Sequence, residues 1–306
     1  MTQAPTNETA TPNPQGNEAQ QKIIEAAIGE ISHIATLPEI TLRIIRLVED
    51  PNSSAKDLTQ VITNDPALGA RILKVVNSAF YGLPGQIGSI NRAIVLLGLN
   101  AVKNIAIAAS LAKLFRGGQI SDQFNARDLW THSIAVATAT HQLADHVGLG
   151  LPDEAFLAGL IHDLGIMVEI QSRRPQFVEA LERVKQDESL PLRKAETEVI
   201  GASHEQFGAA LCSAWKFPQC FAYAAGFHHR PTEVAEANRV LPSLVFVADI
   251  CAARAGMGWS GDLETQEIPS AILEQLNLTQ QKVEEVVEAL PQAMEEAQAI
   301  FGQAAA

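Results

Sequence analysis

Apolar residues recur every three or four positions along nearly the whole chain, and this helical period restricts the fold more than any other feature. From Gln21 to Phe115 almost every segment carries it, for example at Leu58, Val61 and Ile62. The alternation of apolar and polar residues that marks a half-buried strand is absent from this half. The second half is helical by pattern as well. The sequence therefore predicts an all-α fold.

Helix start and stop signals divide the first half into short helices. The tripeptide Asn64-Asp65-Pro66 predicts a helix start, because a side-chain acceptor precedes a proline whose missing N–H costs nothing at the first helical position. We expect this helix to run from Pro66 to about Phe80, with Leu73 buried. Ser89 is expected to cap a further helix that ends at Leu97. Short helices on tight turns are typical of a compact bundle.

The second half is predicted to hold longer helices and most of the negative charge. Residues 21–130 contain 11 basic and 9 acidic residues (+2), whereas residues 131–306 contain 11 and 24 (−13). Residues 1–20 are rich in Thr, Asn, Pro, Gln and Ala without apolar periodicity, so we expect a disordered tail. We expect an N-terminal helical bundle over 21–125 and a second helical domain over 126–306. The expected helices of the second domain span 132–143, 153–170, 177–186, 192–215, 218–227, 242–255 and 278–301.

Composition excludes several classes of protein. The net charge of −13 makes a nucleic-acid partner unlikely, since such proteins neutralise phosphates with basic residues. A hydrophobic fraction of 47% indicates a globular chain. No uninterrupted apolar run is long enough for a membrane span, and the first 21 residues lack Lys and Arg, so we expect a cytoplasmic protein without a secretory signal. Cys212, Cys220 and Cys251 form no Cys-x-x-Cys pair and are expected to be reduced thiols.

One set of polar residues, placed within predicted helices or at their ends, could bind metal. The set comprises His132, His162, Asp163, His204, His228, His229 and Asp249. Imidazole nitrogens and carboxylate oxygens together suit iron, manganese, zinc or nickel. In the segment 159–165 two ionisable groups lie in an apolar helix, where unpaired polar groups are costly. A metal would satisfy both, and a buried hydrogen-bond network is the alternative.

Five short segments of the first half form a distinctive set: Leu37-Pro38-Glu39, the Asp-Pro-Ala-Leu-Gly-Ala-Arg-Ile-Leu run over 65–73, the Val-Asn-Ser-Ala-Phe-Tyr-Gly run over 76–82, the Ser-Ile-Asn-Arg-Ala-Ile run over 89–94, and Leu97-Gly98. Together they resemble the HDOD family, bacterial signalling domains related to HD-type metal-dependent phosphohydrolases. The resemblance covers roughly residues 31–230. It implies an N-terminal HDOD helical bundle packed on an HD-like helical domain.

Similarity to HD and HD-GYP phosphodiesterases implies a division of the seven residues between two metal ions. His132, His162, Asp163 and Asp249 would hold the first, and His204, His228 and His229 would hold the second, with Asp163 bridging. The resemblance thus implies two divalent or mixed-valence metal ions, of which Fe, Mn, Zn and Ni are the candidates. No catalytic residue is assigned.

Two departures from the hydrolase pattern bear on activity. Related hydrolases often carry a lysine three residues after the aspartate of the His-Asp pair, and here that position is Ile166. The segment after His229 begins Arg230-Pro231-Thr232-Glu233 and lacks the Gly-Tyr-Pro element of cyclic-di-GMP phosphodiesterases. Arg230, Arg173 and Arg174 are candidate replacements for the lost charge.

The sequence supports three functional hypotheses in decreasing order. The first is a signal-transduction output module that binds signalling proteins, with a nucleotide as a further candidate ligand. The second is a metal-dependent phosphohydrolase or phosphodiesterase that acts on a nucleotide or phosphoester, which the ligand set favours and Ile166 disfavours. The third, single-stranded nucleic-acid binding, ranks last because only 5% of residues are aromatic.

Overall fold

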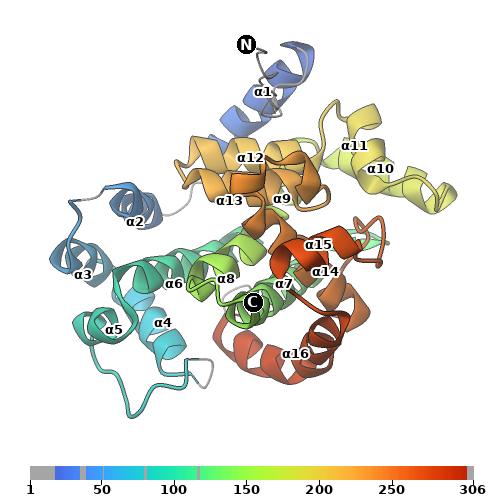
Figure 1. Ribbon diagram of the computed structural model, residues 1–306. Coiled ribbons are helices and arrows are strands. Elements are labelled where there is room, and N and C mark those ends of the chain that lie inside the picture. The colour runs from blue at the N-terminus through green and yellow to red at the C-terminus, as the bar shows by residue number, and fades with distance from the viewer. Residues whose placement is uncertain (1–17, 35–38, 51, 79–80, 116–117, 302–306) are drawn as a thin grey trace, which may run out of the picture.

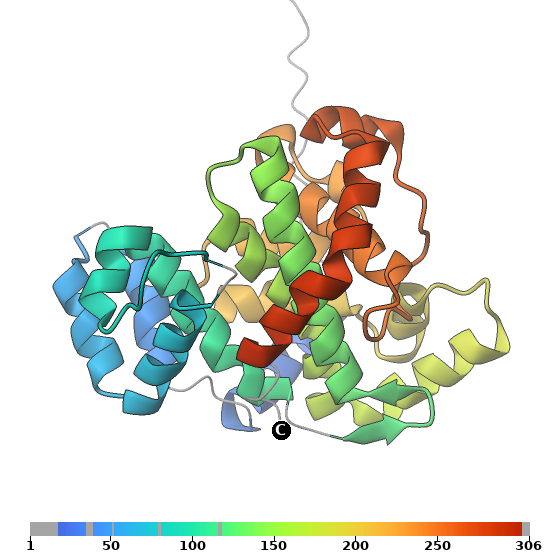
Figure 2. The same cartoon turned by 90° about the horizontal axis from the view of Figure 1, so that it is seen from below.

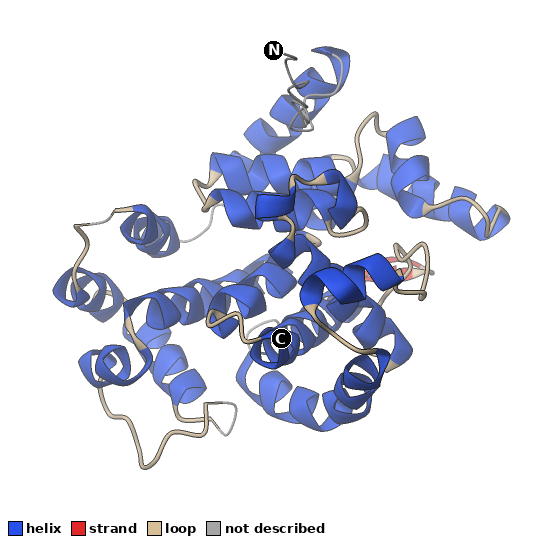
Figure 3. Ribbon diagram, in the orientation of Figure 1, coloured by secondary structure: helices blue, strands red, loops and turns tan. Residues whose placement is uncertain are grey.

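The computed structural model describes residues 18–34, 39–50, 52–78, 81–115 and 118–301, and the regular secondary structure of these residues is almost entirely helical (Figures 1 and 3). The strands within these ranges are β1 (Gln119–Ser121) and β2 (Phe124–Asn125), which pair as a short antiparallel hairpin. The prediction of an all-α fold with an N-terminal bundle packed on a second helical domain is confirmed.

The N-terminal bundle consists of α2 (Glu39–Glu49), α3 (Ala55–Thr63), α4 (Pro66–Val76), α5 (Ile90–Leu97) and α6 (Leu99–Leu111). Its predicted helix starts are correct. The Asp65 side chain accepts a hydrogen bond from the Leu68 amide at 2.9 Å, and Ser89 caps α5 in the same way. Helix α4 ends at Val76, before the predicted end at Phe80, which lies outside the described residues. Leu73 is half-buried rather than buried, because it packs at the edge of the core.

The second domain is built around α7 (Ala126–Val147). Helices α8 (Pro152–Ile161), α14 (Val240–Arg254) and α16 (Gln280–Phe301) pack on it, and Figure 2 shows α16 lying diagonally across α7. The remaining elements are η1 (Ala112–Phe115), α9 (Leu164–Ser172), α10 (Arg174–Gln186), α11 (Leu192–Val199), α12 (His204–Ala214), α13 (Gln219–Phe227), η2 (Pro231–Glu233), η3 (Glu236–Asn238) and α15 (Ser270–Leu276). Helix α6 packs on α8, so the apolar cores of the two domains are continuous.

Two helices that the sequence predicted as continuous are broken. The segment 153–170 is interrupted at His162 and Asp163, which separate α8 from α9. The segment 192–215 is interrupted between α11 and α12, where Gly201 has a φ of +96°. Apolar periodicity continues across both breaks and therefore concealed them. Each break places a candidate ligand at a helix end.

Helix α1 (Glu18–Ile34) lies beside α9 and α12 of the second domain rather than on the N-terminal bundle (Figure 1). Its Gln20 side chain donates hydrogen bonds to Gly201 O and Gln206 Oε1, both at 3.0 Å. A Cβ at Gly201 would lie 2.5 Å from the Ile23 side chain, so a glycine permits this close approach. Residues 18–20, predicted as part of the tail, are thus helical, whereas 1–17 lie outside the described residues.

Within the described residues, the segment 152–172 is long and apolar enough to cross a membrane, although polar residues interrupt it. In the structure this segment is α8 and α9, and 89% of its most apolar window is buried inside the protein. Its apolar character is that of core helices. The cytoplasmic location remains a prediction.

Candidate metal centre

The structure brings the seven candidate side chains together from different elements. His132 lies on α7, His162 and Asp163 lie at the α8–α9 break, and Asp249 lies on α14. His204 is the first residue of α12, and His228 and His229 directly follow α13. The side chain of His229 is 2% exposed and those of the other six are fully buried. The cluster is therefore a group of buried polar side chains within an apolar core.

One half of the cluster contains His132, His162 and Asp249. The Nε2 atom of His132 lies 3.1 Å from Oδ1 of Asp249, and the His132 and His162 rings have centroids 5.4 Å apart. Nε2 of His162 lies 3.2 Å from Oδ2 of Asp163. Donor atoms of His132, His162 and Asp163 all lie within 4.8 Å of one another, which is close enough to contact one cation.

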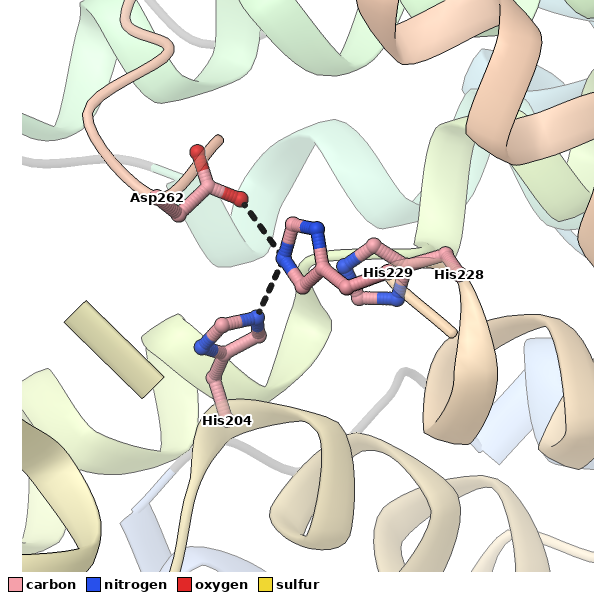
Figure 4. Close-up of side chains that lie close together, drawn as sticks. All are labelled: His204, His228, His229 and Asp262. Carbon is pink, nitrogen blue, oxygen red and sulfur yellow. Dashed lines mark hydrogen bonds and ion pairs between the residues drawn. The ribbon is translucent and has the colours of Figure 1, made fainter. Parts of the chain in front are cut away.

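The other half contains the histidines that follow the second helix break. Oδ1 of Asp163 lies 3.3 Å from Nε2 of His228 and 3.9 Å from Nε2 of His204. The Nε2 atoms of His204 and His229 are 3.1 Å apart (Figure 4). Asp163 thus directs its two oxygens to different halves, which is the arrangement a bridging carboxylate needs.

Asp262 also belongs to this second half, and the sequence analysis missed it. Its Oδ2 lies 3.2 Å from Nε2 of His229, and the residue is 1% exposed (Figure 4). Donor atoms of His204, His228, His229 and Asp262 lie within 4.8 Å of one another. Asp262 is an isolated acidic residue in the long loop between α14 and α15, so neither helical period nor a dipeptide motif could have identified it.

Hydrogen bonds at Nδ1 orient the imidazole rings. Nδ1 of His162 lies 2.7 Å from Gly159 O, and Nδ1 of His228 lies 3.1 Å from Ala225 O. A carbonyl oxygen can only accept, so Nδ1 carries the proton and the lone pair is on Nε2. Nδ1 of His132 likewise faces a carbonyl oxygen, that of Met257, at 3.4 Å. Such partners are the usual way in which proteins present Nε2 to a metal.

When the imidazoles are neutral and protonated at Nδ1, as metal ligands must be, the contacts at the centre of the cluster join atoms that are both acceptors. Nε2 of His132, His162 and His228 lacks a hydrogen bond of good geometry within the described residues, as do both oxygens of Asp163 and Asp249. If Nδ1 carries the ring proton, the lone pair on Nε2 and those on a carboxylate oxygen 3.1–3.3 Å away repel each other unless a cation lies between the two atoms. Buried polar groups left unpaired are costly. A metal would satisfy these atoms, and so would a second ring proton at Nε2 of the histidines beside the carboxylates.

Charges inside the cluster shift its pKa values strongly. Burial lowers the pKa of His162, but the Asp163 carboxylate outweighs burial and raises it to about 9. Burial is also outweighed at His204, where Glu196 raises the pKa to about 10. At His228, burial dominates and lowers the pKa to about 4. Without metal, protons at His162 and His204 would therefore balance the buried carboxylates at neutral pH.

The surroundings of the cluster supply little free positive charge. Ile166, at the position where related hydrolases often carry lysine, is fully buried. The guanidinium of Arg230 is bonded to Glu205 at 2.9 Å and to Glu233 at 2.6 Å. Arg193 also contacts Glu205, at 3.3 Å. Arg230 is thus neutralised by carboxylates, so it does not replace the missing lysine.

Comparison with known families identifies the type of domain. The HDOD domain family matches residues 34–231. A protein of Treponema pallidum (strain Nichols), itself without a described function, is 25% identical over 253 residues, which are 82% of this chain and 48% of that protein. The chain therefore spans about half the length of this curated relative.

Solved structures share the fold. An HDOD domain protein of unknown function from Geobacter sulfurreducens superimposes with a TM-score of 0.74 at 24% identity, covering 94% of this chain and 99% of that one. A protein from Marinobacter aquaeolei VT8 named for signal transduction gives 0.74 and 24%, with 97% and 69% covered. A protein from Shewanella amazonensis SB2B named for metal-dependent phosphohydrolases gives 0.57 and 18%, with 92% and 99% covered. At these identities the likeness shows the fold alone.

Proposed function

Because this chain belongs to the HDOD domain family, we propose that it is a signal-transduction module that acts mainly by binding other proteins and that holds two metal ions in its second helical domain. The observation that carries the proposal is the burial of the side chains of the histidine and carboxylate cluster, of which only that of His229 is exposed at all among the seven candidates, at 2%. A substrate needs an open coordination position and a path to it, whereas a structural or sensory metal does not. The names of two of the three structural neighbours, one for signal transduction and one for a metal-dependent phosphohydrolase, agree with this proposal.

The donor atoms suggest how the metals would be shared. His132, His162 and Asp249 would hold one ion, and His204, His228 and His229 would hold the other. Asp163 would give one oxygen to each, since Oδ2 faces His162 and Oδ1 faces His228. Bound metals would supply positive charge and Lewis acidity at this point. Iron, manganese, zinc and nickel all remain candidates for a nitrogen and oxygen donor set.

Exposed apolar side chains and a hollow beside one of them offer places for a protein partner. Among the described residues, the large apolar side chains that are most exposed are Val95 (76%), Leu96 (41%) and Leu151 (47%). Leu151 lines a hollow of about 300 Å³ between the α5–α6 turn and the start of α8, together with Asp153 and Glu154. This chemistry suits a partner segment with apolar side chains next to basic ones. The two carboxylates disfavour a nucleotide there, because its phosphates are anionic.

Metal analysis of protein purified without a chelating resin tests the proposal. We expect about two equivalents of transition metal by plasma emission spectrometry, lost in Asp163→Ala with the helical circular dichroism retained. The control is His141→Ala, because His141 lies on α7 outside the cluster and contacts Asp145 at 3.6 Å. Less than half an equivalent in the unmodified protein would contradict the two-metal centre and leave a buried hydrogen-bond network.

Hydrolysis of a phosphoester is the alternative function, and the same cluster favours it. Two metals bridged by a carboxylate are typical of enzymes that cleave phosphodiesters. The burial of every candidate ligand and the buried, apolar Ile166 weigh against it. Turnover that disappears in Asp163→Ala would make this alternative the better one.

A further inference from the structure

The loop that carries Asp262 lies directly against the metal centre. We call its residues 256–264 the strap, since they run from the end of α14 past His132 to Asp262 and Glu264. Neither the helical pattern nor the family resemblance gives this segment a role. Its contacts show that it is held in one position.

The first anchor of the strap is the N-terminal part of α7. Gly258 has a φ of +75°, and a Cβ there would lie 2.4 Å from the His132 amide nitrogen and 2.5 Å from Asp128 O. Only glycine permits this approach. The next amide, that of Trp259, donates a hydrogen bond to Asp128 O at 3.2 Å. The backbone of the strap thus touches the helix turn that presents His132.

Aromatic packing fixes the middle of the strap. The Trp259 ring meets the buried Phe124 ring edge to face, with centroids 4.9 Å apart and an interplanar angle of 78°. Gly261 packs so closely on the Trp259 indole that a Cβ there would lie 2.8 Å from it. Edge-to-face contacts of this kind add stability beyond area burial. The turn that leads to Asp262 is therefore set by its neighbours.

The far end of the strap is tied to the helices that carry the second half of the centre. Glu264 accepts hydrogen bonds from Nη2 of Arg193 at 2.7 Å and from Nε at 3.0 Å. Arg193 lies on α11 and also contacts the buried Glu205, which follows His204. Both ends of the strap are thus attached next to ligand-bearing segments.

These anchors hold the Asp262 carboxylate inside the cluster. Within the described residues neither of its oxygens accepts a hydrogen bond of good geometry, although the side chain is fully buried. Its donor atom lies within 4.8 Å of those of His204, His228 and His229. With Oδ1 of Asp163, which the proposed function shares between the two ions, the three imidazoles already make four ligands, so the Asp262 carboxylate would take the further position that catalytic sites keep for water or substrate.

We propose that Asp262 is a metal ligand delivered by the strap, and that it occupies the position that a phosphate or phosphoester oxygen would otherwise take, so that the chain blocks its own metal centre. This inference rests on the proposed two-metal function and deepens it. A carboxylate and a phosphate are both hard anionic oxygen donors, and so they compete for the same cation. Movement of the strap away from α7 would open the centre to anions.

Two variants separate the ligand from its support. Asp262→Ala removes the carboxylate, whereas Gly258→Ala keeps the carboxylate in the chain but forces the strap, and Asp262 with it, away from α7, because the added methyl group has no room. The control is Glu267→Ala, which removes an exposed carboxylate from the same loop beyond the strap. Each full-length protein is loaded with Co²⁺, its metal content is measured, and inorganic phosphate is added while the visible spectrum is recorded.

The expected result is a spectrum that phosphate does not change in the unmodified protein and Glu267→Ala, but does change in Asp262→Ala and Gly258→Ala. We also expect Asp262→Ala to lose metal to a chelator at least about tenfold faster. A metal-loaded unmodified protein that responds to phosphate as Asp262→Ala does would overturn the inference while leaving the metal centre intact. So would two loaded variants that show no response.

A failure of the proposed two-metal function can be told apart from a failure of this inference. In the first case the unmodified protein takes up no Co²⁺, and the measurement of metal content shows this before phosphate is added. If circular dichroism shows that Asp262→Ala does not fold, Asp262→Asn, which keeps the side-chain volume, and Gly258→Ala decide the question. An absence of phosphate binding in both of these loaded proteins then counts against the blocking role.

Discussion

Glu196 holds His204 at two atoms. Its Oε2 lies 2.9 Å from the backbone nitrogen of His204 and 2.8 Å from Nδ1 of the ring. Both residues are fully buried, so water does not compete for these bonds. The carboxylate therefore fixes the place of the ring and keeps the proton on Nδ1, which leaves Nε2 free to face His229 and Asp163.

This relationship predicts that Glu196→Gln weakens metal binding without unfolding the protein. The amide keeps the size of the side chain but loses its charge, and losses of such supporting partners typically cost about 10–100-fold in metal affinity. Competition with a chromophoric chelator measures the effect. Glu198→Gln is the matched control, because Glu198 is on the same helix and contacts only the exposed Arg183 in the ion pairs described. Equal affinities in the two variants would contradict the role given to Glu196.

The pKa values of His162 and His204 predict that metal uptake releases protons. With values of about 9 and about 10, both imidazoles are protonated at pH 7 in the metal-free protein. Metal binding requires neutral Nε2, so each ion must displace a proton. Calorimetry at pH 7 in two buffers of different ionisation enthalpy should give different heats. Identical heats would mean that neither imidazole loses a proton.

The same pKa values fix the sign of the pH dependence of stability without metal. A histidine whose pKa is higher in the folded than in the unfolded chain binds more protons when folded. Its stabilising contribution is complete below the unfolded value near 6.5 and is lost as the pH rises through the folded pKa of about 9 to 10. Thermal midpoints of chelator-treated protein should therefore fall from pH 7 to pH 10. Protein loaded with metal should instead be destabilised by acid, which expels the metal.

The sequence predicted the fold and its helix starts because local signals determine them. Asp65 and Ser89 cap the helices that they were expected to cap, through bonds to amides three residues away. The broken helices at His162 and Gly201 were not predicted, since apolar periodicity continues through them. The seven candidate ligands could be named because polar groups in apolar helices are conspicuous. Asp262 could not, because only the three-dimensional path of the strap brings it to His229.

Ile166→Lys should destabilise the protein rather than activate it. The resemblance to hydrolases that often carry a lysine at this position suggests the substitution as a way to restore the missing charge. The structure places Ile166 on α9 with no exposure to solvent. Burying an ammonium without a partner is costly, so we expect a loss on the order of 3 kcal/mol or more in the free energy of unfolding. Urea denaturation measures it. An unchanged midpoint would mean that the lysine reaches water or a carboxylate.

Hydrolysis of a generic phosphodiester should be weak or undetectable even when both metal positions are filled. Two metals can polarise phosphoryl oxygens, but the negative charge that remains in the transition state needs a further cationic side chain. Ile166 cannot supply one, and the Arg230 guanidinium is already bonded to Glu205 and Glu233. Losing one such contact costs on the order of a hundredfold or more in rate. Turnover of bis-para-nitrophenyl phosphate by metal-loaded protein measures this, with Asp163→Ala as the background. Robust turnover that Asp163→Ala abolishes would make the protein an enzyme and reverse the order of the two functions.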